Sequence, residues 1–246
     1  MTRVAAVLLA LVVLAGCSGG SDPESAPRPS TSSPTATPSD VPPPAAPESG
    51  ACYRIGYDDA IASHNDARPV KCSAGHTSTT YYVGEVLNPT EQVAALQCTD
   101  RLGQDTRLTM LRPVWFTPTP AEIAAGARWF RCDVVAVASD GELASLSDPL
   151  GDPDQYAMCG TAEPGSADFH RVICSRPHTW RAVSVVPFSS ASYPGEAAVR
   201  DAGQEPCETA GAAAADDALD YRWGYEWPTR EQWNAGQHYG RCWAPA

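Results

Sequence analysis

The sequence predicts an α+β protein made of two tandem, homologous, disulfide-stapled modules that follow a disordered stalk rich in proline and serine. Three observations lead to this fold class: an N-terminal export signal, an even number of cysteines beyond that signal, and a pair of motifs that occurs twice in the same order. We divide the chain into a lipoprotein signal peptide (1–16), a lipid-anchored stalk (17–50), a first module (51–138), a linker (139–155) and a second module (156–246).

The first 16 residues have the pattern of a bacterial export signal. Arg3 gives a positive start, and residues 4–14 are all apolar. A membrane-spanning helix needs about 20 such residues, so this run is too short to remain in the membrane. It ends in LAGC at residues 14–17, which resembles the lipobox of bacterial lipoproteins. We expect lipidation of Cys17 and a location on the outer face of the cell membrane, with an ordinary secretory signal as the alternative.

Residues 18–50 are dense in proline and serine. Such a segment cannot bury enough apolar surface to fold, so we expect an extended, disordered stalk that holds the rest of the chain off the membrane. The whole chain has a formal net charge of −12. Nucleic-acid binding needs a basic surface, so we expect no nucleic-acid partner. The membrane is expected to be a partner only through the lipid at Cys17.

Eight cysteines remain when Cys17 is set aside from the nine in the chain. An even count in an exported protein indicates four disulfides, although eight cysteines allow 105 pairings. We expect every bridge to lie within one module. We prefer nearest-neighbour pairing, in which the third and fourth cysteines of each module tie its long helix to its last strand. The preferred pairs are Cys52–Cys72, Cys98–Cys132, Cys159–Cys174 and Cys207–Cys242.

An internal repeat is the strongest signal in the sequence. The pattern V-x-C-S-x-x-H-T occurs at residues 70–77 and again at 172–179. The pattern P-T-x6-G-x2-[WY]-x-R-C occurs at 118–132 and at 228–242, without a gap in either case. Two motifs that recur in the same order, with another cysteine between them, indicate one module used twice.

Local patterns predict the same elements in both modules. Stretches rich in Thr, Tyr, Val and Phe after each His-Thr pair favour strands at 77–86 and 179–188. Proline at the first helical position and glutamate at the third predict helices from about 89 to 102, with Asn88 as N-cap, and from about 194 to at least 202. Short helices should begin at capping boxes headed by Thr119 and Thr229 and end near Gly126 and Gly236. A last strand follows at 128–137.

The His-Thr pairs, His76-Thr77 and His178-Thr179, are candidate binding residues. Each histidine follows a cysteine by four positions, a spacing that could supply two zinc ligands per module. Thiolate ligands would compete with disulfide formation in an oxidising compartment, so we expect no metal. The favoured interpretation is structural, with each imidazole bonded to backbone or to an aspartate at the start of a strand.

No pattern supports catalysis. The mature sequence has no G-x-S-x-G, C-x-x-C or H-E-x-x-H motif. The paired acids Asp58-Asp59 and Asp216-Asp217 are more typical of solvated surface than of a glycosidase. Tyr225 and Trp227 are candidates for a carbohydrate-stacking platform or for core, and Trp233 is expected in the core. We therefore expect no enzyme activity and no cofactor.

The duplicated motifs and their cysteine framework resemble the septum formation family of actinobacterial membrane proteins and lipoproteins, over residues 52–242. The resemblance implies a non-cytoplasmic accessory protein linked to cell division, without an agreed mechanism or ligand. We expect a lipid-anchored protein that binds a protein or cell-wall partner. The alternatives are an envelope hydrolase acting on peptidoglycan and a metal-binding surface protein.

Overall fold

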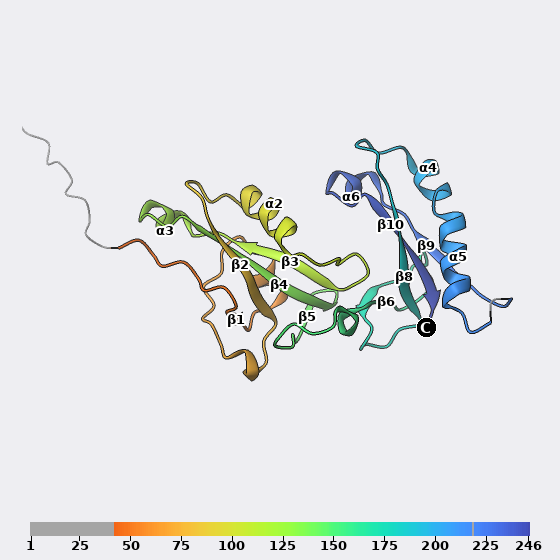
Figure 1. Ribbon diagram of the computed structural model, residues 1–246, viewed down its shortest axis with the longest axis horizontal. Helices are drawn as coiled ribbons and strands as arrows, with labels where there is room; N and C mark the ends of the chain where they lie inside the picture. Colours follow the sequence, from red (N-terminus) through yellow and green to blue (C-terminus); the bar gives the residue numbers. More distant parts are fainter. Residues whose placement is uncertain (1–41, 218) are drawn as a thin grey trace, which may run out of the picture. The chain divides into compact units, whose positions relative to one another are not determined.

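The computed structural model describes residues 42–217 and 219–246. The signal peptide, Cys17 and most of the stalk lie outside the described residues. Within them, helices and strands form two antiparallel sheets, one in an N-terminal half (residues 51–146) and one in a C-terminal half (residues 156–246) (Figure 1). The predicted mixture of helices and strands is confirmed.

The N-terminal sheet has the strand order β1-β2-β4-β3, with β5 paired to β4. All of its pairings are antiparallel, and β3 is an edge strand. A 3₁₀ turn at Cys72–Ala74 precedes β2. The elements are β1 (Cys52–Tyr53), α1 (Tyr57–Ala60), β2 (Ser78–Glu85), α2 (Glu91–Arg101), β3 (Leu111–Phe116), α3 (Pro120–Ala124), β4 (Trp129–Ser139) and β5 (Glu142–Ala144).

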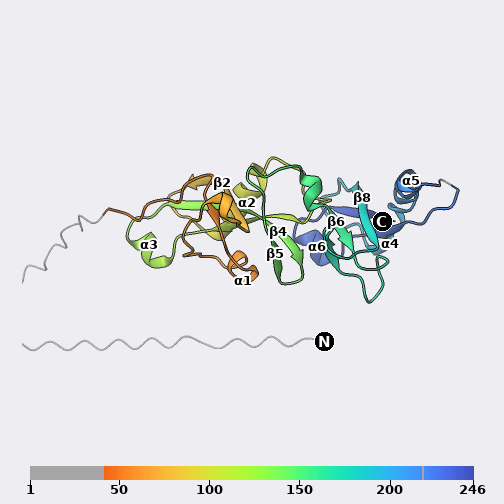
Figure 2. The ribbon, with the colours of Figure 1, turned by 90° about the horizontal axis from the view of Figure 1, so that it is seen from below.

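The C-terminal sheet has the strand order β7-β6-β8-β10-β9. Its longest pairing joins β8 to β10, and α5 lies beside both strands (Figures 1 and 2). The elements are β6 (Met158–Gly160), β7 (Arg171–Ile173), β8 (Trp180–Pro187), α4 (Glu196–Asp201), α5 (Gln204–Ala214), β9 (Gly224–Glu226), α6 (Arg230–Asn234) and β10 (Tyr239–Pro245). A 3₁₀ turn at Pro153–Tyr156 leads into this sheet.

Both halves contain the short capped helix that the sequence predicts. The hydroxyl of Thr119 accepts a hydrogen bond from the N–H of Glu122, and the Glu122 carboxylate accepts one from the N–H of Thr119. Thr229 and Gln232 make the same two bonds at the start of α6. Gly126 follows α3 with φ 102°, and its counterpart after α6 has φ 96°. That left-handed backbone is accessible to glycine at little cost, which explains why both helices stop there.

The long helices differ from the prediction at their starts. The N-cap of α2 is Thr90 and not Asn88, because the Thr90 hydroxyl accepts the N–H of Val93 and leaves Pro89 outside the helix. In the C-terminal half, Gly195 is the N-cap of α4, so the predicted start at residue 194 is also too early.

The predicted C-terminal helix is two helices, α4 and α5, that meet at Gly203. A Cβ at Gly203 would collide with the ring of Tyr225, so only glycine allows this approach. The expected linker, 139–155, contains β5, which extends the N-terminal sheet through pairing with β4.

One buried apolar cluster draws on both halves. Leu111 and Val134 of the N-terminal sheet belong to it together with Met158 and Trp243 of the C-terminal sheet. Smaller clusters lie within each half, between the sheet and its long helix. The helix-side clusters contain Cys98, Cys132, Cys207 and Cys242, so one disulfide of each half is part of its core.

Candidate functional site

Within the described part of the chain, four disulfides each join a cysteine to the next one in sequence, and none crosses between the halves. Two of them tie a helix to a strand and are fully buried at both ends: Cys98–Cys132 and Cys207–Cys242. The other two, Cys52–Cys72 and Cys159–Cys174, each have one buried and one partly exposed cysteine. Of these four bridges, two are therefore protected from solvent and two are accessible to it.

His76 follows one of the solvent-reached bridges and is itself buried, with 1% of its surface exposed. Its Nδ1 lies 2.9 Å from the carbonyl oxygen of Cys72, so Nδ1 carries the proton and donates it. Its carbonyl oxygen accepts the N–H of Leu146. The preceding residue, Gly75, has φ 75°, which turns the chain so that the imidazole enters the interior. The geometry agrees with a structural role for His76.

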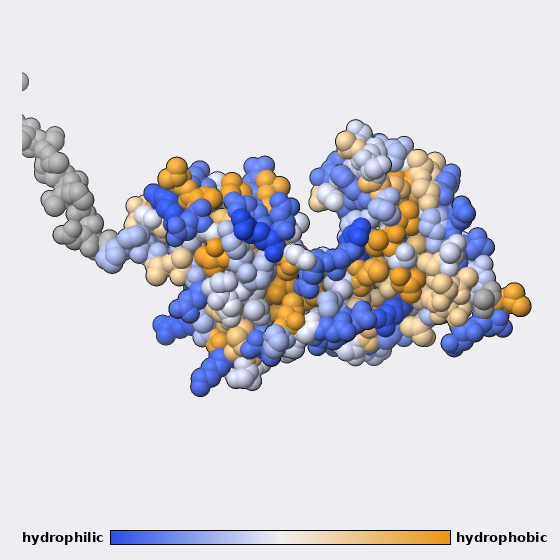
Figure 3. Space-filling view, in the orientation of Figure 1, coloured by the Kyte–Doolittle hydropathy of each residue, from blue (hydrophilic) through white to orange (hydrophobic). Residues whose placement is uncertain are grey.

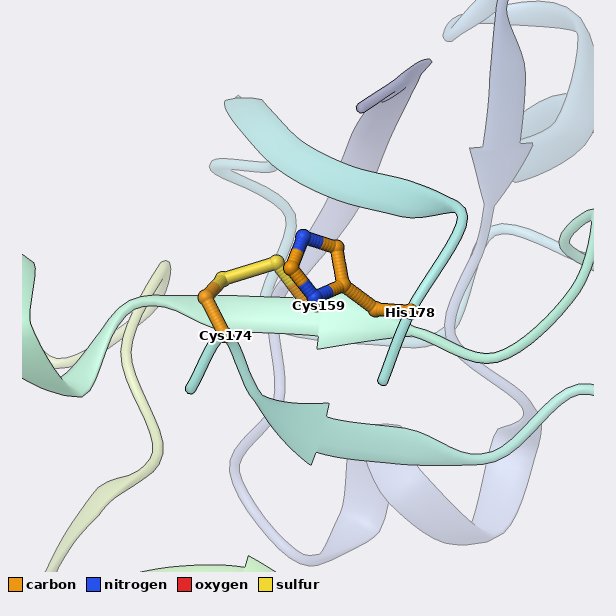
Figure 4. Close-up of side chains that lie close together, drawn as sticks. All are labelled: Cys159, Cys174 and His178. Carbon is orange, nitrogen blue, oxygen red and sulfur yellow. A yellow bond between two sulfur atoms is a disulfide. The ribbon is translucent and has the colours of Figure 1, made fainter. Parts of the chain in front are cut away.

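His178 occupies the corresponding motif position but stays at the surface. Its Nδ1 lies 2.7 Å from the carbonyl oxygen of Arg176. The residue before it is Pro177, whose ring fixes φ near −65° and so excludes the turn that Gly75 makes. The imidazole instead lies beside the Cys159–Cys174 bridge (Figure 4). Thr77 and Thr179 bond to backbone, Thr77 to Ile55 and Thr179 to Thr161.

The arginine of the second motif is a buried residue in both halves, which sequence reasoning missed. In the N-terminal half, Arg131 Nε lies 3.1 Å from a carboxylate oxygen of Asp133, and the guanidinium lies 4.0 Å from the ring centroid of Tyr53. Hydroxyls of Ser78 and Thr80 donate to the Asp133 carboxylate at 2.7 Å each. Burial raises the pKa of Asp133, whereas Arg131 and the two hydroxyls favour its charged form.

Arg241 takes the equivalent place in the C-terminal half with different partners. Trp243 stands two positions after it, where Asp133 follows Arg131, and Glu226 of β9 supplies the nearest carboxylate at 3.8 Å. The Nε of Arg241 donates to the carbonyl oxygen of Arg107 at 2.9 Å. Burial lowers the pKa of Arg241. The recurrence of Arg-Cys in both motifs was the available signal for these two buried cations.

Strand β3 leaves a backbone edge open. The N–H of Val137 donates to the carbonyl of Met110, and bonded pairs alternate along an antiparallel ladder, so Pro113 and Trp115 fall at non-bonded positions facing away from β4. Pro113 has no N–H, which fits this position. The open stretch is bounded at its far end by Thr117, whose N–H donates to the carbonyl of Ser63.

An apolar pocket of about 300 Å³ lies along this edge. Exposed apolar side chains stand in the same half: Ile61 at the pocket, Leu87 before α2 and Leu96 on α2. In Figure 3, orange residues gather over α2 and the loop that precedes it. The residues that line the pocket are Ala60, Ile61, Ala62, Ser63, Glu91, Pro113, Val114 and Trp115.

The aromatic candidates of the C-terminal half separate into core and partial surface. Trp233 is buried, as predicted. Tyr225 is also buried, donates its hydroxyl to the carbonyl oxygen of Val199, and has a pKa raised to about 12 by burial. Trp227 is half-buried and lines a 270 Å³ hollow together with Tyr225. The acidic pairs at 58–59 and 216–217 are exposed.

The fold and these features define a disulfide-bonded protein with mixed helices and strands in two sheets. A family model described as septum formation matches residues 90–242, which is more than half of the chain. The chain therefore belongs to the septum formation family. Neither the curated proteins nor the solved structures contain a significant match. Among the described residues, none of the helices has the length and apolar character needed to cross a membrane.

Proposed function

We propose that this chain is a lipid-anchored, extracytoplasmic binding protein that works in cell division through contact with a partner protein. Family membership supports the link to septum formation. Four disulfides support an oxidising compartment outside the cytoplasm. In this proposal Cys17 carries the lipid, the stalk extends the folded part from the membrane, and the two halves are homologous modules that arose by duplication.

The open edge of β3 is the observation that carries the binding function. An extended segment of a partner can add to such an edge, because unpaired backbone groups supply hydrogen bonds and neighbouring pockets receive alternate side chains. Here the apolar pocket lies beside the open groups, with Ile61 exposed at its rim. The occupant that fits is a short extended peptide with an apolar side chain, since Pro113 and the Ser63–Thr117 contact limit its length.

A photo-cross-linking side chain at position 61 tests this surface in intact cells. Leu219 is the matched control, because it is an exposed apolar side chain in the C-terminal half, 96% exposed against 68% for Ile61. We expect a defined cross-linked partner from position 61 that is not captured from position 219. Substitution Val114→Asp in the pocket should abolish that cross-link. Identical products from both positions would refute the assignment.

The anchor has a separate test. The substitution Cys17→Ser should release the protein from the membrane or leave its precursor uncleaved. Processing at the same site with full membrane retention would refute the lipoprotein proposal.

We also propose that the chain has no catalytic activity, with a peptidoglycan hydrolase as the rival. Incubation of the purified protein with cell wall separates the two. The binding proposal expects no release of soluble wall fragments, and release that depends on the added protein would favour the hydrolase.

A further inference from the structure

Two sulfur atoms and an imidazole nitrogen meet at the surface of the C-terminal half. A ring nitrogen of His178 and the two Sγ atoms of Cys159 and Cys174 all lie within 4.8 Å of one another. Figure 4 shows the imidazole beside the bridge. Cys174 and His178 are partly exposed, so solvent and solutes reach the group. Two cysteine sulfurs and one histidine nitrogen form a donor set typical of Zn²⁺ and related cations.

The hydrogen bond of His178 sets its tautomer. Nδ1 lies 2.7 Å from the Arg176 carbonyl oxygen, which only accepts hydrogen bonds. Nδ1 therefore carries the proton, and Nε2 keeps a lone pair for a ligand. A backbone carbonyl that fixes the second ring nitrogen is the usual support of a metal-binding histidine.

We propose that Cys159, Cys174 and His178 form a site for a soft or borderline divalent cation that is closed while the disulfide is intact and opens when it is reduced. The metal ligand is the thiolate, and both sulfurs are otherwise committed to the S–S bond. A dithiol opens the site: it transfers two electrons and two protons, becomes a disulfide itself, and leaves Cys159 and Cys174 as thiols. The cation then displaces two thiol protons and binds two thiolates and Nε2, with the fourth position left to water.

Selective reduction is possible because the four bridges differ in protection. Thiol–disulfide exchange needs access to a sulfur atom. Cys174 is partly exposed, whereas both ends of Cys98–Cys132 and Cys207–Cys242 are fully buried. A mild dithiol should therefore open the Cys159–Cys174 bridge and leave the two core bridges in place.

The N-terminal half supplies an internal control. Its bridge, Cys52–Cys72, is also partly exposed, and the same spacing leads to His76. That imidazole is buried, and among the described residues the geometry of a three-ligand group is met only by the C-terminal set. The same sequence pattern therefore predicts a site in one half and none in the other.

The test uses two full-chain variants and Co²⁺ as the probe. The first, Cys52→Ser with Cys72→Ser, keeps the C-terminal set. The second, Cys159→Ser with Cys174→Ser, keeps the N-terminal set. Each is reduced with an immobilised dithiol, separated from it without oxygen, and titrated with Co²⁺.

We expect the first variant to bind one Co²⁺ per chain, with intense thiolate-to-cobalt absorption that Zn²⁺ displaces, and the second to bind none. Adding His178→Ala to the first should weaken Co²⁺ binding at least about tenfold. The oxidised first variant should bind none. Equal binding by both variants, binding by the oxidised protein, or unchanged affinity without His178 would overturn the proposal. If reduction unfolds the first variant, Zn²⁺ must restore its near-ultraviolet circular dichroism, and failure to do so overturns it equally.

Discussion

The two halves use the same motif residues in different environments. Gly75 turns His76 into the interior, whereas Pro177 keeps His178 outside beside a disulfide. The motif arginines show a related difference, since Arg131 has a fully buried carboxylate partner and Arg241 has a partly exposed one. A shared pattern therefore fixes the position of a residue along the chain, while its surroundings in each half decide what the side chain contacts.

The largest expected effect comes from losing the disulfides of both halves. Each bridge should contribute roughly 3 kcal/mol, against a total stability of about 5–15 kcal/mol for a typical domain. Complete reduction should therefore unfold both halves, while EDTA should leave the melting temperature of the oxidised protein unchanged. Thermal melts followed by circular dichroism check both outcomes. An EDTA-sensitive, reductant-resistant protein would mean that the native fold depends on a metal.

The two core bridges allow the halves to be compared directly. They close loops of nearly equal length, with sequence separations of 34 and 35. Because loop length sets most of the entropic stabilisation, replacing either pair by alanines should lower the free energy of unfolding by a similar amount, about 3–4 kcal/mol. Urea titrations of the two double variants measure it. A clear inequality would show that one half holds its helix by packing more than by its bridge.

Loss of the carboxylate partner should destabilise the protein more at Arg131 than at Arg241. Asp133→Ala leaves Arg131 buried without its charge partner and should cost about 3–5 kcal/mol. Glu226→Ala should cost less, about 1–2 kcal/mol, because Glu226 is partly exposed, Arg241 keeps its backbone acceptor, and Arg171, the other partner of Glu226, is itself partly exposed. Equal losses in urea unfolding would contradict the distinction drawn between the two arginines.

Substitution of the residue before each histidine should have a smaller effect on stability, and its cause is the backbone conformation. Open space surrounds the position where Gly75 would carry a Cβ, so Gly75→Ala adds strain only through its positive φ, about 1–3 kcal/mol. Pro177→Gly should cost about 1 kcal/mol or less, mainly by freeing the unfolded chain. Chemical denaturation measures the free energy of unfolding of both variants. A larger loss for Pro177→Gly than for Gly75→Ala would contradict this prediction.

The smallest effect is expected to be equal in the two halves. Thr119 and Thr229 cap their helices through the same hydrogen bond, so Thr119→Ala and Thr229→Ala should each cost about 1 kcal/mol. Serine at either position should restore most of the loss, because its hydroxyl makes the same bond. Urea unfolding measures both losses, and clearly unequal losses would show that one of the two threonines has a role beyond capping.

Features with local causes could be predicted from the sequence. The capping boxes at Thr119 and Thr229 and the glycine stops depend on residues within a few positions, and each occurs twice. The N-cap of α2 was predicted wrongly at Asn88, because Thr90 is an equally good N-cap and its hydroxyl accepts the N–H of Val93.

Features with distant causes were missed. Gly203 lies where α4 ends and α5 begins, and its missing Cβ admits the ring of Tyr225, a contact that local sequence does not reveal. Strand β3 escaped prediction because Pro113 is unfavourable inside a sheet, and only an edge position tolerates it. The difference in burial between His76 and His178 depends on the residue before each of them, and its effect is seen only when the backbone direction is known.

The nearest-neighbour order of the bridges has a consequence for how the chain acquires them. A polypeptide leaves the ribosome or a translocation channel N-terminus first, so its cysteines emerge in order. Each of the four bridges joins a cysteine to the next one along the chain, so every bridge can close before the following pair is present. With Cys17 lipidated, as proposed, the eight remaining cysteines emerge as four successive pairs, so closure in order of emergence would give this pairing out of the 105 that eight cysteines allow.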